Sequence, residues 1–317
     1  MTQIDKSRFE WIGSDSARRE GISRPSTTFW KDAIGRLVKN KVAVVCFFII
    51  VLLILSCIIV PFFSPFESRE QHLGEVNKGF MTVCTDSRYE GQHHVHYFGT
   101  DNLGRDLFLR AFEGGRVSLM IAFAAVFVNL IVGLIYGGIS GYVGGAVDTI
   151  MMRIVEIVNG IPSLIVVILL MMVLPKGIFT MVVAYGITGW TGMARLVRGQ
   201  VLQLKSQEYI VAAEAMGAKS SRIIAKHLIP NALSVIIINV TLAIPSAIFT
   251  EAFLSYIGLG VPVPQPSWGV LAKGGQDVFM TYPYQLVVPA VAISLTMLSF
   301  NLLGDGLRDA FDPRLRR

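Results

Sequence analysis

The chain has 317 residues, of which 53% are hydrophobic and only 16% are charged, and its mean hydropathy is +0.58. Soluble domains carry about 25% charged residues, and disordered chains combine few apolar residues with much net charge. The composition therefore excludes a disordered chain and nearly excludes a water-soluble enzyme. The net charge of +6 comes from basic residues that lie mostly beside apolar runs, which indicates membrane orientation rather than nucleic-acid binding. The composition predicts an all-α polytopic membrane protein whose surroundings are lipid, not nucleic acid.

Residues 1–41 are expected to be a polar cytoplasmic tail without the early apolar segment of a cleavable signal peptide. Within it, apolar residues from Phe29 to Val38 recur at helical spacing and form one stripe. We expect an amphipathic helix in the membrane interface, with a solvated helix packed on protein as the alternative. Residues 42–60 contain no charge, Gly or Pro, and the segment 42–63 is predicted to be the first transmembrane helix.

An external loop, 64–116, should follow the first span. Gly99-Thr100-Asp101 is a turn and cap signal. The apolar residues of 107–112 predict a short helix on the outer membrane surface, in which Asp106 and Arg110 pair at i, i+4. With Cys84, the histidines of this loop form either a metal cluster or a solvated polar loop, and the sequence assigns no metal ligand. These histidines are His72, His93, His94 and His96.

Further apolar runs complete six predicted crossings, so both termini lie on one side of the membrane. The loops and tails on that side carry 20 Lys and Arg against 7 on the other, and the richer side should be cytoplasmic. Residues 117–305 are the predicted core and 306–317 a cytoplasmic tail. Before the last span, Trp268 is expected to anchor at the interface rather than to stack on a ligand. The five further apolar runs are 117–139, 161–174, 177–193, 232–253 and 286–303. The run 161–174 is short, so we expect it to extend back through 147–158 with a kink near Pro162.

The inner loop 206–231 is predicted to be a helical hairpin directly before a membrane span. Helix formers run to Met216, and Gly217 suits the position just after a helix, where a positive φ has no steric cost. Ser220 or Ser221 can cap a second short helix over 222–228. Pro230 can occupy the first turn of the next span, where its missing N–H is harmless. A push on this hairpin would therefore be delivered to that span.

The pattern Ala212-Ala213, Gly217 and Leu228-Ile229-Pro230 resembles the coupling loop of ABC importer permeases. That loop docks on the cytoplasmic ATPase, and the glutamate that names the motif aligns with Val211 here. The segments 96–119, 253–269 and 301–314 are similar to signatures of the oligopeptide/dipeptide branch. The chain is most similar to the C-type membrane subunit of an oligopeptide importer.

The resemblance implies a type I ABC importer permease with six transmembrane helices in a bacterial cytoplasmic membrane, and not an enzyme. The implied partners are a homologous B-type permease subunit, two cytoplasmic ATPase subunits and an extracellular peptide-binding protein. The dipeptide Gly-Lys does not occur, so no Walker A loop exists here; no cofactor is assigned to this chain, and ATP and Mg belong to the partners. The expected ATPase-coupling residues are Glu208, Ala212, Ala213, Glu214, Gly217, Leu228 and Pro230.

Polar side chains within membrane spans are candidates for the translocation path. Asn129, Asn239 and Glu251 are of this kind. Alternatives remain open at this point. The same fold could import dipeptides, nickel or peptide signals, and a chain of a different class would be a channel or sensor component without an ATPase partner.

Overall fold

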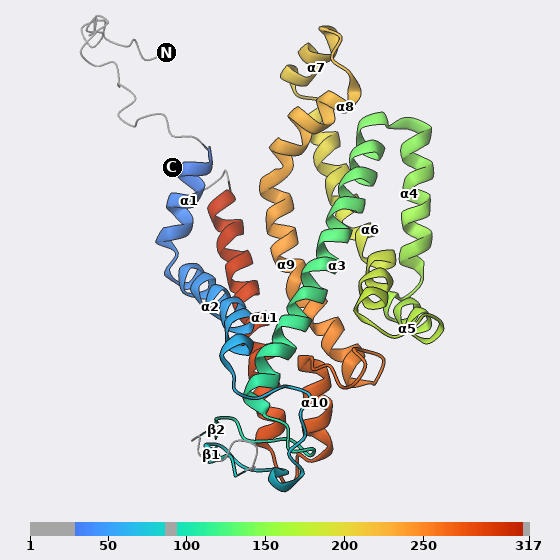
Figure 1. Cartoon of the computed structure of the whole chain (residues 1–317). Coiled ribbons are helices and arrows are strands. Elements are labelled where there is room, and N and C mark those ends of the chain that lie inside the picture. Colours follow the sequence, from blue (N-terminus) through green and yellow to red (C-terminus); the bar gives the residue numbers. More distant parts are fainter. Residues whose placement is uncertain (1–28, 86–93, 313–317) are drawn as a thin grey trace, which may run out of the picture.

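The structure is a computed structural model that describes residues 29–85 and 94–312 (Figure 1). Long helices dominate it, and a small two-stranded antiparallel ribbon lies at the end opposite to α7 and α8 (Figure 1). The all-α membrane architecture predicted from composition is confirmed. In chain order the elements are α1 Phe29–Lys39, α2 Lys41–Phe63, a 3-10 helix Leu73–Glu75, β1 Thr82–Val83, β2 Val95–His96, α3 Leu107–Val143, α4 Gly145–Gly160, α5 Ser163–Val173, α6 Ile178–Lys205, α7 Glu208–Ala215, α8 Ser220–Ile223, a π-helix Ile224–Leu228, α9 Ile229–Tyr256, α10 Trp268–Asp277 and α11 Tyr284–Phe311.

The N-terminal helix α1 has both a protein-facing side and an exposed side. Ala33 is 2% exposed and packs with Phe311 at the end of α11. The ring of Trp30 meets that of Phe311 edge to face at 5.7 Å between centroids. Ile34 and Val38 remain exposed. The predicted amphipathic helix is therefore present, and one face of it packs on protein while the other keeps the apolar surface that an interfacial helix needs.

The second long helix, α3, begins earlier than predicted. Asp106 is its N-cap, with the side chain accepting a hydrogen bond from Leu109 N–H, and the helix continues without a break to Val143. A separate surface helix over 107–112 was therefore wrong. α3 continues through Gly114 and Gly115. Their lack of a side chain lets α3 lie close to Ser267 and Trp268, since a Cβ on Gly115 would lie 2.7 Å from the Trp268 ring.

The chain between α3 and α6 forms two separate helices where the sequence predicted one kinked span. α4 and α5 are bent by 76° at a break that contains Pro162. Proline fixes its own φ and disfavours helix in the residue before it. The predicted kink position is thus confirmed, and the bend is sharp enough to make the pair either a broken span or a re-entrant loop.

Among the described residues, four helical segments are long and apolar enough to cross a membrane, or five if the α4–α5 pair counts as one span. These four are α2, α3, the continuous stretch Ser220–Tyr256 and α11. α6 has 28 residues, about 42 Å at 1.5 Å per residue, but it is less apolar. The count of six crossings stays a prediction.

Close helix approach holds this core together. A Cβ on Gly137 of α3 would lie 2.2 Å from the carbonyl oxygen of Ala194 on α6, so only glycine permits this contact. Small residues at such crossings are typical of membrane helix packing. The principal apolar cluster joins α2, α3, α9, α10 and α11.

The loop before the last span, predicted to be external, contains a helix, α10, that sequence reasoning missed. Trp268 opens α10 and is 1% exposed. Its indole N–H donates to the Ala111 carbonyl at 2.9 Å, and its backbone N–H donates to Ser118 Oγ at 3.1 Å. Trp268 therefore ties α10 to α3, and its predicted role as an interface anchor is wrong.

Candidate functional site

The inner hairpin begins with α7, which projects beyond the ends of the long helices beside α8 (Figure 1). The helix ends in a Schellman motif at Gly217, whose φ is 77°. Gly217 N–H donates to Glu214 O at 2.9 Å, and Ala218 N–H donates to Ala213 O at 3.1 Å. The predicted role of Gly217 as the residue after the helix is confirmed.

The second arm of the hairpin is continuous with α9. α8 passes through the π-helix directly into α9, with Ile229 N–H donating to Ile224 O. A separate Ser-capped helix was wrong, because Lys219 is the N-cap and, within the described part of the chain, makes no side-chain capping bond. The wider π-turn lies where the ring of Pro230 would otherwise press on the preceding helical turn.

Buried side chains fix this hairpin to the membrane helices. Ile210 of α7, Ile223 of α8 and Leu228 are each 0% exposed. They pack in one cluster with Val197 and Val201 of α6. Leu228 therefore positions the hairpin from within, and displacement of α7 would carry α6 and α9 with it.

A polar contact links the hairpin to the end of α3. The Tyr142 hydroxyl donates to Glu214 Oε1 at 3.0 Å, and Lys205 Nζ donates to the Tyr142 carbonyl at 2.6 Å. Lys205 Nζ also lies 5.1 Å from the centroid of the Tyr142 ring, in a cation–π geometry. Glu214, singled out from the sequence, thus contacts Tyr142 of this chain.

The outward face of α7 is partly apolar. Of the predicted coupling residues, Glu208, Ala212, Glu214, Gly217 and Pro230 are exposed or partly exposed, while Ala213 and Leu228 are buried. Three further apolar side chains, which the sequence did not single out as contacts, are exposed on α7 and at its C-cap: Tyr209 at 44%, Val211 at 55% and Met216 at 82% exposed. Helix spacing could have indicated only Val211, which lies between the buried positions Ile210 and Ala213. Tyr209 and Met216 lie four and three residues from Ala213, so their spacing gave no signal of exposure.

An ion pair ties α4 to α6 at the same inner end. Arg198 Nε lies 2.6 Å from Asp148 Oδ1, and its terminal nitrogen lies 2.5 Å from Oδ2. Ser140 of α3 also donates to Asp148 Oδ1, at 2.5 Å. Bidentate arginine–carboxylate pairs fix orientation as well as distance.

The three candidates for the translocation path lie in different surroundings. Asn129 is 8% exposed and packs on Gly189 of α6. Glu251 is 2% exposed, and Ser255 Oγ donates to its Oε1 at 2.8 Å; its Oε2 has no hydrogen-bond partner among the described residues. Asn239 is half-buried and borders a cavity of about 620 Å³ near Trp30 and Arg308. Asn239 therefore has the most open surroundings, and all three assignments stay predictions.

The outer end brings together a different set of potential metal ligands from the histidines considered above. Glu75, Cys84 and His96 are buried, and one donor atom of each lies within 4.8 Å of the others. Burial acts to raise the pKa of Glu75, but hydrogen bonds from Thr85, His96 and Cys84 outweigh it and lower that pKa. Burial acts to lower the pKa of His96, but hydrogen bonding with Asp106 and Glu75 and their charges raise it. His93 lies outside the described residues.

Long apolar helices, with a hairpin that is anchored on them and continuous with one of them, define a helical membrane protein. Residues 130–317 match the family described as binding-protein-dependent transport system inner membrane component. Residues 28–79 match the N-terminal TM domain of oligopeptide transport permease C. The chain therefore belongs to the ABC importer permeases, in the branch of C-type oligopeptide permease subunits.

Three relatives show how far the similarity extends. The oligopeptide transport system permease protein OppC of Bacillus subtilis (strain 168) is 49% identical over 317 residues, which cover 100% of both chains. The dipeptide transport system permease protein DppC of the same organism is 47% identical over 94% of this chain and 90% of its own. OppC of Escherichia coli (strain K12) is 41% identical over 99% of each chain.

Proposed function

We propose that this chain and a homologous B-type permease subunit enclose a path through a bacterial cytoplasmic membrane for oligopeptides delivered by an extracellular binding protein. The identity to permeases named for oligopeptides, over the full length of the chain, supports the cargo. The 47% identity to a permease named for dipeptides keeps a shorter cargo as the second candidate. The six apolar runs support six crossings, and the excess of Lys and Arg on one side supports both termini in the cytoplasm.

The function of the inner hairpin is to receive motion from two cytoplasmic ATPase subunits, which bind ATP and Mg and carry out hydrolysis. The observation that carries this assignment is that α7 and its C-cap expose Tyr209, Val211 and Met216, while the other arm is continuous with α9. An apolar exposed face is suited to a protein partner. Because Ile210 and Leu228 are buried against α6 and α9, a partner that moves α7 moves those helices.

ATP binding switches the path between its outward-open and inward-open states only if the ATPases contact the two states with different free energies. In this chain the hairpin supplies that contact. The small side chain of Ala212 lets the ATPase surface approach, and the Schellman turn at Gly217 sets the angle between the two arms. The Tyr142–Glu214 contact extends the connection to α3.

The direct test is the exposed substitution Ala212→Arg in the full chain, co-expressed with the sister permease and the ATPases. Arginine is a good helix former, so α7 should persist while the long side chain blocks close approach. We expect the ATPases to be lost from the purified complex and peptide uptake into proteoliposomes to fall at least tenfold. Ala146→Arg, an exposed site in α4 at the same end, is the matched control and should retain both.

Retention of the ATPases by Ala212→Arg would contradict the docking role of α7. A wild-type chain that purifies as a homo-oligomer, without ATPases, would favour the channel or sensor class instead. Competition of uptake by peptides of graded length, with the purified binding protein present, separates oligopeptide from dipeptide cargo, and nickel and peptide signals enter the same assay as competitors.

A further inference from the structure

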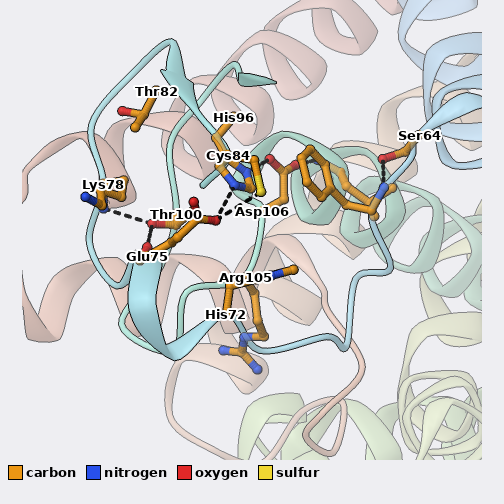
Figure 2. Close-up of polar contacts among 12 residues, drawn as sticks. Ser64, His72, Glu75, Lys78, Thr82, Cys84, His96, Thr100, Arg105 and Asp106 are labelled. Atoms are coloured by element: carbon orange, nitrogen blue, oxygen red, sulfur yellow. Dashed lines mark hydrogen bonds and ion pairs between the residues drawn. The ribbon is translucent and has the colours of Figure 1, made fainter. Parts of the chain in front are cut away.

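Four buried polar side chains from separate segments converge at the outer end of the molecule, far from the inner hairpin. Figure 2 shows Glu75, Cys84, His96 and Asp106 directed toward one another. Glu75 ends the 3-10 helix, Cys84 follows β1, His96 lies in β2, and Asp106 caps α3. Their exposed fractions are 2%, 8%, 0% and 2% in that order.

The spacing of three donor atoms fits a small cation. Glu75 Oε2 lies 3.3 Å from Cys84 Sγ and 3.1 Å from His96 Nε2. A tetrahedral zinc site with bonds of about 2.0–2.3 Å has donor–donor edges of about 3.3–3.7 Å. Two of the three edges are therefore close to those of a zinc site, and the third pair, Cys84 Sγ and His96 Nε2, lies within 4.8 Å.

The histidine is already oriented for coordination. His96 Nδ1 lies 2.7 Å from Asp106 Oδ2, which directs Nε2 toward Glu75 and Cys84. The ring of Phe66 stacks on the His96 imidazole at 4.4 Å between centroids and restricts its rotation. A carboxylate on the far nitrogen of a ligating histidine is the usual second layer of a zinc site, because it fixes the tautomer and makes the ligating nitrogen more basic.

The donor types select the metal. A thiolate, an imidazole and a carboxylate suit zinc, whereas magnesium and calcium prefer sets of oxygen ligands. With Cys84 as thiolate and His96 neutral, two ligand anions and Asp106 surround the divalent ion. Three protein ligands leave a fourth position that water can fill; the imidazole of His72, 6.3 Å from that of His96 between ring centroids, is a nearby side chain of the right type.

We propose that Glu75, Cys84 and His96 bind a zinc ion, with Asp106 as the positioning residue behind His96. Binding forms bonds from zinc to Cys84 Sγ, His96 Nε2 and a Glu75 oxygen, and it releases the thiol proton and any proton on Nε2 to solvent, with no change of oxidation state. The ion would join the 3-10 helix, both strands of the ribbon and the start of α3. It would thereby brace the outer loop on the helix that packs against α10.

The test uses the full chain with an affinity tag that contains no histidine. The protein is stripped with chelator, incubated with zinc and desalted, and bound metal is measured by mass spectrometry. We expect about one zinc ion per chain and a higher midpoint of thermal unfolding when zinc is present. Cys84→Ala should abolish both effects. Cys57→Ala, which removes a buried thiol from α2, is the matched control and should keep both.

A positioning variant and a spectroscopic probe distinguish this site from metal bound elsewhere on the chain. Asp106→Asn keeps an oxygen to cap α3 but replaces the acceptor for His96, so zinc affinity should fall about 10–100-fold. Cobalt added to the stripped wild-type chain should give a thiolate-to-metal charge-transfer band, a readout that does not depend on whether Cys84→Ala folds. Zinc binding that survives Cys84→Ala and disappears in His94→Gln would place the metal in the histidine loop and overturn the proposal. A wild-type chain that retains no zinc and shows no cobalt band would overturn it as well.

Discussion

At the scale of single residues, one buried aromatic side chain joins α10 to α3. Trp268 contacts α3 through its indole N–H, its backbone N–H and the face that covers Gly115. Sequence reasoning places a tryptophan after three prolines at the membrane interface, where tryptophan is enriched. Its burial could not be predicted, because it follows from α10 folding back against Gly114 and Gly115, a contact between segments about 150 residues apart.

The substitution Gly115→Ala tests how tightly this contact is packed. The added Cβ would lie 2.6 Å from Cys57 Sγ and 2.7 Å from the Trp268 ring, so either α3 or α10 must shift. Overpacking of this kind costs about 1–3 kcal/mol. We expect a lower thermal unfolding midpoint in detergent. Gly199→Ala in α6, where nothing lies within 4 Å of the new Cβ, is the control and should be neutral or stabilising, because alanine is the better helix former. Equal midpoints for the two variants would contradict the packing argument.

At the scale of elements, the inner hairpin can transmit motion from a partner to α6 and α9 only if the turn between its two arms is rigid. Gly217 has a φ of 77° and open space around its missing Cβ, so its constraint is conformational rather than steric contact with neighbours. Its position could be predicted from the sequence because helix C′ positions favour glycine. The π-turn that makes the second arm continuous with α9 could not, because local signals at Ser220 and Pro230 fit a separate helix equally well.

Gly217→Val should uncouple ATP hydrolysis from uptake while leaving the chain in the membrane. A β-branched residue in the left-handed region costs about 1–2 kcal/mol, so the Schellman turn should open and change the angle of α7. Peptide uptake and ATPase activity, measured together in proteoliposomes, report the coupling. Gly217→Asn is the matched control, since asparagine tolerates this region better, and it should stay closer to wild type. Full coupling in Gly217→Val would show that the hairpin is only a linker.

The pair Asp148–Arg198 should hold α4 against α6. Asp148→Asn removes the charge from a bidentate contact between side chains that are 14% and 33% exposed, so we expect a loss of about 1–2 kcal/mol in unfolding free energy. Glu156→Gln is the comparison, because it breaks the Arg153–Glu156 pair, which forms at 2.6 Å with both side chains more than half exposed. Exposed pairs contribute about 0–1 kcal/mol. The idea fails if the two variants unfold at the same denaturant concentration.

At the scale of the whole molecule, long apolar runs predict most of the helices and miss their relations to one another. The uncharged run 42–60 becomes α2, and the run 232–253 becomes the apolar part of α9. A run shows that a helix is apolar but not whether it crosses the membrane or turns back, which is why the sharply bent α4–α5 pair was predicted as one span. The outer cluster of Glu75, Cys84 and His96 was missed for a related reason: its members come together only through the β1–β2 ribbon and the cap of α3.

The sidedness of the chain can be decided by comparing one site at each end of the continuous helix Ser220–Tyr256. Met216 precedes this helix and is 82% exposed, and Val263 follows it and is 72% exposed. A single crossing between them requires that they lie on opposite sides. From the excess of Lys and Arg around Met216 we expect its side to be the cytoplasm. In intact cells, Val263→Cys should react with a membrane-impermeant maleimide and Met216→Cys should react only after permeabilisation, with the parent chain giving the background. Reaction of both variants in intact cells would remove the hairpin from the reach of any cytoplasmic ATPase, and the proposed coupling with it.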